Sequence, residues 1–265
     1  MTDWLALCRA ASAEVARAVD ALPGRAEREP VVGAGRGGDD TTAVDAAAER
    51  AVLEVLWASG ESFVLVSEEL GEETVGDDPR VRIVVDPIDG SNNAKRGIPH
   101  WALSIAVAEG DTMDDVVFGY VHDLGTGEEW TASRGEGAFL DGARLTQRPK
   151  DELEILAFEA TTTAAIAERA AAMVGVAYRL RIMGSLAIAL CNLAAGRIDG
   201  VCSLKPARSV DIAAAQLLVR EQGLAIDLFE DPPFGAAPLD LGRRSRVAAA
   251  GTPELCARLA DALGA

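Results

Sequence analysis

The N-terminal part of the chain carries two stretches in which apolar side chains recur every three or four positions. The first runs from Trp4 to Leu22 and ends at Pro23-Gly24, and the second covers residues 42–57. This spacing places the apolar side chains on one face of a helix, so both stretches predict amphipathic helices. Residues 25–40 between them are polar and rich in glycine, which predicts a mobile loop.

From residue 63 onward the pattern changes to short β-branched and aliphatic runs, which predict strands at residues 63–66, 81–85, 103–108, 116–121, 129–132 and 155–159. The last of these follow one another without helices, which favours antiparallel pairing. Beyond residue 162, helical patterns at 163–174, 185–195, 210–221 and 252–263 alternate with strand-like runs near 178–182, 200–204, 225–228 and 246–250. This order predicts an α/β (α+β) fold, a single domain over residues 1–265 with two interlocked halves at about 1–150 and 151–265.

The chain of 265 residues carries 42 acidic and 25 basic side chains, a formal charge of −17. This surplus argues against nucleic acid and membrane surfaces as partners, because both would repel the protein. The N-terminus has no signal-peptide pattern and the four cysteines show no metal spacing, so a cytoplasmic protein is expected. The chain has two histidines, His100 and His122, so a metal ion would have to be held by oxygen atoms.

Residues 85–93 hold the strongest candidate chemistry. An apolar strand runs directly into Asp86 and Asp89, with Pro87 and Gly90 shaping the turn. In such a turn the two carboxylates and the Ile88 carbonyl can face one point, which suits a hard cation. A helix that starts at residues 91–93 would offer free amides to a phosphate group. Taken alone, the turn also fits a structural role in which the aspartates cap backbone amides.

Two further acidic positions favour the metal-site interpretation. Glu68 also follows an apolar strand, and Asp211 lies at the start of a helix rich in small residues. Each has a structural alternative, an acidic loop for Glu68 and a favourable helix N-terminal charge for Asp211. Together with Asp86 and Asp89 they supply oxygen ligands for two or three Mg²⁺ ions, which would bind phosphate, activate water and stabilise a leaving oxygen.

Residues 84–93 resemble the hallmark motif W-[IV]-[IV]-D-P-[IL]-D-G-[ST] of the inositol monophosphatase superfamily, which includes the archaeal-type fructose-1,6-bisphosphatases. Further elements of that family occur in the same order at residues 39–45, 67–69, 183–187 with 195–200, and 210–215 with 220–223. The resemblance covers nearly the whole chain. It implies a layered αβαβα sandwich and a hydrolase, namely a magnesium-dependent, lithium-sensitive phosphatase that acts on small phosphorylated substrates as a homodimer.

The resemblance also implies which residues hold the metal ions. Glu68, Asp86 and the Ile88 carbonyl would hold one Mg²⁺. Asp86, Asp89 and Asp211 would hold a second, with Glu68 near a third, weaker ion.

The implied catalytic residues are Asp45, Ser91 and Glu68. Ser91 would polarise the attacking water with Asp45 behind it; the family's commoner threonine is replaced by this serine, which keeps the hydroxyl. The residues expected to bind the substrate are Gly90, Ser91, Gly184, Ser185, Lys205 and Arg208.

Lys205 and Arg208 mark a departure from the family's inositol enzymes, which typically carry a glutamate near position 203. Without that acid, myo-inositol phosphate is a weaker candidate, and the two basic groups could hold a second phosphate or another anionic group. Each of them taken singly is explained equally well as an exposed basic residue of an acidic protein. Fructose 1,6-bisphosphate is therefore expected slightly ahead of inositol monophosphate, with 3′-phosphoadenosine 5′-phosphate and histidinol phosphate as alternatives. Arg36, Arg179 and Arg181 add positive charge, and the sequence does not decide whether they contact the substrate.

Two other classes of function are compatible with part of the sequence. Residues 33–38 match the dinucleotide motif G-x-G-x-x-G, but the preceding apolar run is too short for a first strand, and two acidic residues follow. A regulatory or partner-binding protein of the same fold would be expected to lack a metal carboxylate or an activating residue. All of these are present here, so an enzyme is the prediction.

Overall fold

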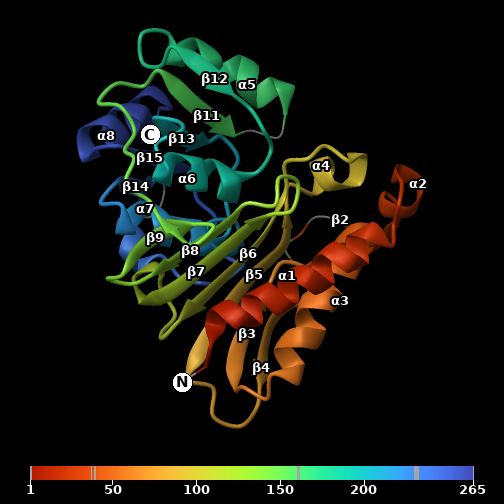
Figure 1. The fold of residues 1–265 in the computed structure, drawn as a ribbon. Helices are drawn as coiled ribbons and strands as arrows, with labels where there is room; N and C mark the ends of the chain where they lie inside the picture. Colours follow the sequence, from red (N-terminus) through yellow and green to blue (C-terminus); the bar gives the residue numbers. More distant parts are fainter. Residues whose placement is uncertain (1, 37, 39, 160–161, 230–232, 265) are drawn as a thin grey trace.

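Two β-sheets and three layers of helices alternate through the protein, whose computed structural model describes residues 2–36, 38, 40–159, 162–229 and 233–264 (Figure 1). In the described chain the large sheet has eight strands in the order β10-β9-β8-β7-β6-β5-β3-β4. Its strands are β3 (Phe63–Ser67), β4 (Gly71–Val75), β5 (Val81–Asp89), β6 (Ala102–Ala108), β7 (Val116–Asp123), β8 (Glu129–Ser133), β9 (Gly137–Leu140) and β10 (Ala143–Arg144).

The second sheet lies on the other side of a helical layer, and its five described strands have the order β12-β11-β13-β15-β14. These strands are β11 (Ile155–Glu159), β12 (Arg179–Arg181), β13 (Gly200–Ser203), β14 (Ala225–Leu228) and β15 (Val247–Ala250). The helices are α1 (Trp4–Asp20), α2 (Arg25–Arg28), α3 (Ala43–Ala58), α4 (Ser91–Arg96), α5 (Thr163–Arg169), α6 (Leu186–Ala194), α7 (Ser209–Glu221) and α8 (Pro253–Ala262).

Alternating side chains of the large sheet fill two different cores. On β5, Ile83 and Val85 pack with α1 and α3, whereas Val84 packs with α6 and α7. The outer face of the second sheet packs against α8, where Leu259 is fully buried. The resulting order of layers is helix, sheet, helix, sheet, helix, which confirms the predicted αβαβα sandwich (Figure 1).

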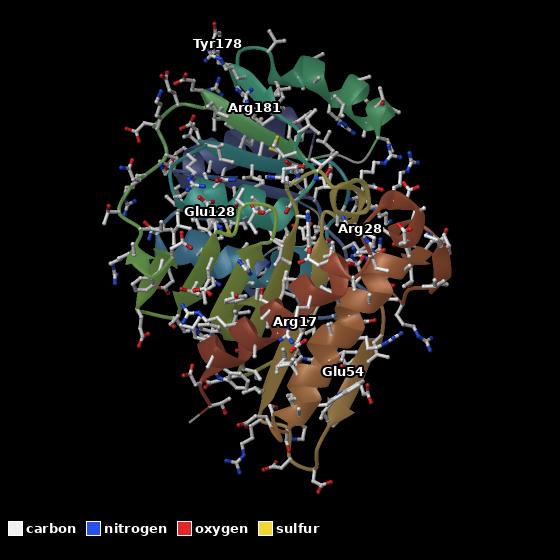
Figure 2. All side chains as sticks on the ribbon, turned by 45° about the vertical axis from the view of Figure 1, so that its right-hand side comes forward. Arg17, Arg28, Glu54, Glu128, Tyr178 and Arg181 are labelled. Atoms are coloured by element: carbon white, nitrogen blue, oxygen red, sulfur yellow. The ribbon has the colours of Figure 1, made fainter. Side chains whose placement is uncertain are left out.

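The apolar face of α1 illustrates how the predicted helices form. Asp3 precedes the helix and its carboxylate accepts a hydrogen bond from the Ala6 amide at 3.0 Å. Val15 and Val19 are buried against the large sheet. Arg17, on the opposite side, and Glu54 of α3 are exposed, as expected for amphipathic helices that cover a sheet (Figure 2).

Three regions differ from the sequence-based expectation. Residues 25–40 were expected to form a loop, but they hold the short α2 and a two-stranded antiparallel ribbon of β1 (Val31–Ala34) and β2 (Asp40–Thr42). The strands β4, β9 and β10 were not predicted. The helix expected over 163–174 ends as α5 at Arg169 and continues as a 3₁₀ turn, Ala170–Met173. No helix within the described ranges is both long and apolar enough to cross a membrane.

All described strands of the large sheet precede residue 145, and all described strands of the second sheet follow residue 154. Helices α6 and α7 come from the later part of the chain, yet they pack against β5, β6 and β7 of the large sheet. The division of the domain into halves at about residue 150 stays a prediction.

Candidate active site

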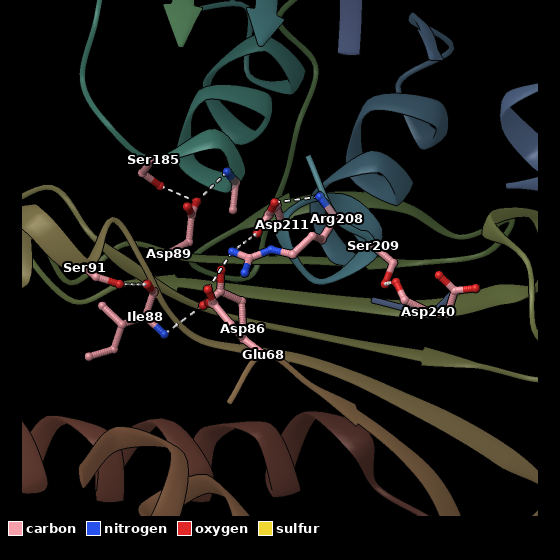
Figure 3. A network of polar contacts seen from close by, with 11 residues as sticks. Glu68, Asp86, Ile88, Asp89, Ser91, Ser185, Arg208, Ser209, Asp211 and Asp240 are labelled. Atoms are coloured by element: carbon pink, nitrogen blue, oxygen red, sulfur yellow. Dashed lines mark hydrogen bonds and ion pairs between the residues drawn. The ribbon is translucent and has the colours of Figure 1, made fainter. Parts of the chain in front are cut away.

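The residues predicted to form a turn, Asp86 to Asp89, are instead the last residues of β5, where a bulge interrupts the pairing with β6. Asp86 pairs with Ser104 of β6 while Asp89 pairs with Ala102, so the register between the two strands shifts there. The Asp86 carboxylate accepts the Ile88 amide at 3.0 Å, and the Ile88 carbonyl accepts the Ser91 hydroxyl at 3.1 Å (Figure 3). These bonds hold both aspartates near one point of the sheet edge.

Gly90 makes the turn possible because its φ is +99°, a left-handed value that other residues rarely adopt. A side chain at this position would also meet the carbonyl oxygens of Gly184 and His100, each 3.1 Å from the site of a Cβ atom. Helix α4 begins at the next residue, Ser91, as the sequence predicts.

Glu68 reaches the same edge because β3 and β5 are parallel neighbours. Ser67, the last residue of β3, lies opposite Val85, so Glu68 and Asp86 are the next residues on the two neighbouring strands. The carboxyl ends of parallel strands meet at one edge of a sheet, where α/β proteins commonly bind ligands.

Asp89 and Asp211 are held by the helices of the middle layer. One oxygen of Asp89, Oδ2, accepts both the Ser185 hydroxyl and the Ala187 amide at 2.6 Å, which ties the large sheet to the start of α6 (Figure 3). Asp211 lies in the first turn of α7, where its Oδ2 atom accepts the Arg208 amide at 2.7 Å.

Arg208 lies inside this group of acidic residues. Its Nη2 atom is 2.6 Å from Glu68 Oε1 and 3.2 Å from Asp211 Oδ1, and the side chain is 10% exposed (Figure 3). The sequence predicted that Arg208 binds substrate, a role that stays a prediction. In this structure its guanidinium is paired with two of the predicted metal ligands.

Burial and mutual repulsion disfavour the ionised forms of these carboxylates. Burial raises the pKa of Glu68 to about 7, with the nearby charge of Asp211 adding to the rise and Arg208 opposing it. Burial also raises the pKa of Asp89 to about 7, against the hydrogen bond from Ser185. The pKa of Asp86 is raised well above its usual value by burial and by the charges of Glu68 and Asp89.

The residues fit a hard divalent cation by their chemistry. Glu68, Asp86, Asp89 and Asp211, together with the Ile88 carbonyl, are all oxygen donors, which Mg²⁺ prefers, and positive charge would relieve the repulsion among the acids. As the side chains stand, the described residues contain no group of three or more His, Cys, Asp or Glu side chains arranged to hold a metal ion.

The raised pKa values predict that the metal-free protein becomes less stable as the pH rises. Glu68 and Asp89 have folded-state pKa values of about 7, above those of the unfolded chain, so the folded state binds more protons between these values. Its stability is therefore greatest near the unfolded values and declines as the pH passes through about 7. Urea unfolding in EDTA across this range would measure the decline, and saturating Mg²⁺ would flatten it. A stability that rises with pH in EDTA would contradict the prediction.

Asp45 lies at the start of α3, close to the site, and one of its two carboxylate oxygens has no hydrogen-bond partner among the described residues. Its Oδ2 atom accepts the Thr42 amide at 3.1 Å and the Thr42 hydroxyl at 2.5 Å, and Lys95 Nζ of α4 is 3.7 Å away. The Oδ1 atom is buried and has no hydrogen-bond partner among the described residues. Ser91 donates to the Ile88 carbonyl instead of to Asp45. The two predicted catalytic groups are therefore not hydrogen-bonded to each other in this structure.

The remaining predicted substrate residues fall in different places. Gly184 and the buried Ser185 lie beside Gly90 and Asp89, and the described contact of the Ser185 hydroxyl is with Asp89. Lys205 is exposed on the loop between β13 and α7. Substrate contact by these residues stays a prediction.

Three arginines were left undecided by the sequence. The Arg36 amide donates to the Glu69 carbonyl at 3.1 Å, which places this exposed residue next to Glu68. Arg179 and Arg181 lie on the edge strand β12, and Arg179 Nη1 is 3.1 Å from Glu154 Oε1. Tyr178 and Arg181 are labelled at this part of the second sheet in Figure 2. Gly37 and Asp39 of the predicted motifs lie outside the described residues.

Two buried acids that support the site were missed by the sequence reasoning. Glu159, at the end of β11, accepts the Met183 amide at 3.2 Å and the Gly184 amide at 2.8 Å, and so fixes the turn that leads to Ser185. Glu49 of α3 accepts the Ser67 hydroxyl and the Leu70 amide, which holds the segment carrying Glu68. A signal existed for Glu159, because it ends an apolar strand as Glu68 and Asp86 do.

The αβαβα fold and the buried carboxylates beside the parallel strands β3 and β5 together indicate the class of protein to which this chain belongs. The family model described as the inositol monophosphatase family matches residues 4–264. A fructose-1,6-bisphosphatase/inositol-1-monophosphatase of Methanothermobacter thermautotrophicus is 31% identical over 270 residues, covering 98% of this chain and 96% of that protein. A Nus factor SuhB of Pasteurella multocida is 36% identical over 193 residues, 70% of each chain.

Among solved structures, an inositol monophosphatase–fructose 1,6-bisphosphatase superposes with a TM-score of 0.85 at 26% identity, covering 98% of this chain and 100% of the other. The chain therefore belongs to the inositol monophosphatase family, a family of phosphatases.

Proposed function

We propose that the protein is a Mg²⁺-dependent phosphomonoesterase that hydrolyses a small sugar or cyclitol phosphate, with fructose 1,6-bisphosphate slightly ahead of inositol monophosphate. The observation that carries the proposal is the group of four carboxylates, Glu68, Asp86, Asp89 and Asp211, gathered at one edge of the large sheet. The names of the archaeal relatives, which join the two activities, support both substrates.

In the proposed reaction the chain positions a water molecule and a phosphate ester against each other. When bound, two or three Mg²⁺ ions would supply the positive charge that holds the phosphate and makes the attacking water more acidic. The unpartnered Oδ1 of Asp45 is a buried acceptor for a proton of that water, and Lys95 Nζ lies 3.7 Å from the other oxygen, Oδ2. Ser91 would orient the same water. A new P–O bond forms to the water oxygen, the ester P–O bond breaks, and the sugar hydroxyl leaves with a proton.

The substrate site would lie beside Gly90, at the end of β5, and Gly184, in the loop that leads to α6. A Cβ atom on Gly90 would lie 3.1 Å from the Gly184 carbonyl oxygen, so the phosphate would meet backbone there. Lys205 and Arg208 are the proposed partners of a second anionic group.

Several finer features of the proposal rest on the family resemblance. These are inhibition by lithium, a homodimeric assembly and a cytoplasmic location. The alternatives to fructose 1,6-bisphosphate and inositol monophosphate as substrate are 3′-phosphoadenosine 5′-phosphate and histidinol phosphate. The name of the Pasteurella relative, a Nus factor, favours a second candidate function, that of a partner-binding protein. The complete set of acidic residues favours the enzyme.

The proposal predicts phosphate release only in the presence of Mg²⁺. We expect the purified protein to hydrolyse fructose 1,6-bisphosphate or inositol 1-phosphate in a panel that also includes the two alternative substrates. Phosphate release with and without Mg²⁺ would be measured for each compound. Turnover that persists undiminished in EDTA would exclude the metal mechanism. A folded protein that releases no phosphate from any substrate would favour the partner-binding function.

A further inference from the structure

The position of Arg208 has a consequence for how the site takes up its metal ions. The Nη2 atom lies 2.6 Å from Glu68 Oε1, a close charge-assisted contact, and 3.2 Å from Asp211 Oδ1, a longer hydrogen bond. The same two carboxylates, Glu68 and Asp211, would be needed as oxygen ligands of a divalent cation. The guanidinium and the cation would therefore compete for them.

We propose that Arg208 is a built-in counter-cation of the carboxylate group, and that its guanidinium must leave Glu68 and Asp211 before a divalent cation is bound. This inference rests on the proposed function, because it concerns the same site. It assigns to Arg208 a positioning role that precedes any contact with substrate.

Charge balance supports an exchange of cations over simultaneous binding. In the metal-free site the charge of one guanidinium acts on Glu68, Asp86 and Asp211, while Asp89 is the fourth acid of the group. Two divalent ions would match the charge of all four carboxylates. A guanidinium that stayed would then face two cations at close range with no unmatched carboxylate, a repulsion that the buried position would strengthen.

The local geometry allows the guanidinium to leave without disturbing the ligands. The backbone amide of Arg208 donates to Asp211 Oδ2 at 2.7 Å, whereas the guanidinium contacts the other oxygen, Oδ1. Departure of the side chain would therefore free Oδ1 while the backbone still fixes Asp211. Asp89 is arranged in the same way, since both of its hydrogen bonds go to Oδ2.

The test measures metal affinity on the full-length protein and does not depend on activity. Mn²⁺ binding, followed by the EPR signal of the free ion, would be compared for the wild type, Arg208→Gln and Arg220→Gln. Arg220 is the matched control because it lies on the same helix, α7, and pairs with Asp114 at 2.6 Å, away from the carboxylates.

We expect Arg208→Gln to bind its first Mn²⁺ about tenfold more tightly than the wild type, because no guanidinium has to be displaced. In EDTA the same variant should melt at a lower temperature than either of the other proteins, since its acids lack their counter-charge. Arg220→Gln should bind Mn²⁺ as the wild type does. Equal or weaker Mn²⁺ binding by Arg208→Gln would overturn the proposal.

A measurement on the wild type covers the case in which Arg208→Gln does not fold. Labelling by an arginine-specific dicarbonyl, mapped by mass spectrometry, should become several-fold faster at Arg208 when Mn²⁺ is added, while the rate at Arg220 stays constant. Protection of Arg208 by Mn²⁺, or no change, would contradict the exchange.

The outcomes separate this inference from the proposed function. If Mn²⁺ binds and supports phosphate release but Arg208→Gln has wild-type affinity, the exchange fails and the phosphatase stands. If the folded wild type binds no Mn²⁺, both fail.

Discussion

Replacing Asp89 with asparagine should lower the rate of Mg²⁺-dependent phosphate release by about a thousandfold or more. The carboxylate is buried at the junction of β5 and α6 and is one of four acids proposed to hold the metal ions. Asparagine keeps the shape and can still accept the Ser185 hydroxyl and the Ala187 amide through its oxygen. It removes the negative charge, on which the affinity for the cation and its placement depend. Steady-state phosphate release at saturating Mg²⁺ would measure the loss.

The same substitution should not destabilise the metal-free protein at neutral or higher pH. Burial raises the pKa of Asp89 to about 7, so the ionised carboxylate costs folding free energy that a neutral amide does not. Urea unfolding in EDTA would therefore separate a lost ligand from a lost fold. Asp114→Asn is the matched control, because Asp114 is largely exposed and should be silent in both assays. An Asp89→Asn enzyme with near wild-type turnover would exclude Asp89 as a ligand.

Replacing Gly90 with alanine should destabilise the protein by about 2–4 kcal/mol and abolish most activity. The residue has a φ of +99°, and a Cβ atom would lie 3.1 Å from the carbonyl oxygens of Gly184 and His100 and 3.2 Å from Trp101 Cβ. Backbone strain and crowding therefore act together, and relief requires the segments at Gly184 and at His100–Trp101 to move away from Gly90. Unfolding in urea and phosphate release would be measured on the same preparation.

Gly97→Ala is the control for Gly90→Ala. Gly97 also has a positive φ, +72°, but nothing lies within 4 Å of its added Cβ atom. It should show the strain alone, about 1–2 kcal/mol, with little effect on turnover. Equal destabilisation by the two alanines would mean that the contact between Gly90 and Gly184 is not tight.

The sequence predicted the parts of the site that are determined locally. The turn at Asp86 and Asp89 follows from an apolar strand that meets proline and glycine, and the position of Glu68 follows from a second strand end. Their proximity is then a consequence of parallel pairing between β3 and β5. The layered sandwich was implied by the family resemblance, and the structure has it.

Features that have no apolar pattern, or that depend on distant neighbours, were not predicted. Residues 71–75 look like an acidic loop, yet they form the edge strand β4, where the acidic side chains are exposed and only the backbone has to pair. The ion pair of Arg208 with Glu68 joins residues far apart in the chain, and the spacing of apolar and polar residues does not predict such a contact. Glu159 likewise has a role only because the segment at residues 183–184 passes above it.

The start of α7 has a consequence for the growing chain on the ribosome. The acids at positions 68, 86 and 89 lie in the first half of the chain and are synthesised early, but Asp211 and its helix come in the last quarter. Helix α7 also fills the space between the two sheets, so the middle layer cannot close before it emerges. A nascent or prematurely terminated chain would therefore display a negatively charged, unfinished pocket with no ability to process substrate. Catalytic competence would arrive in one late step, when synthesis is nearly complete.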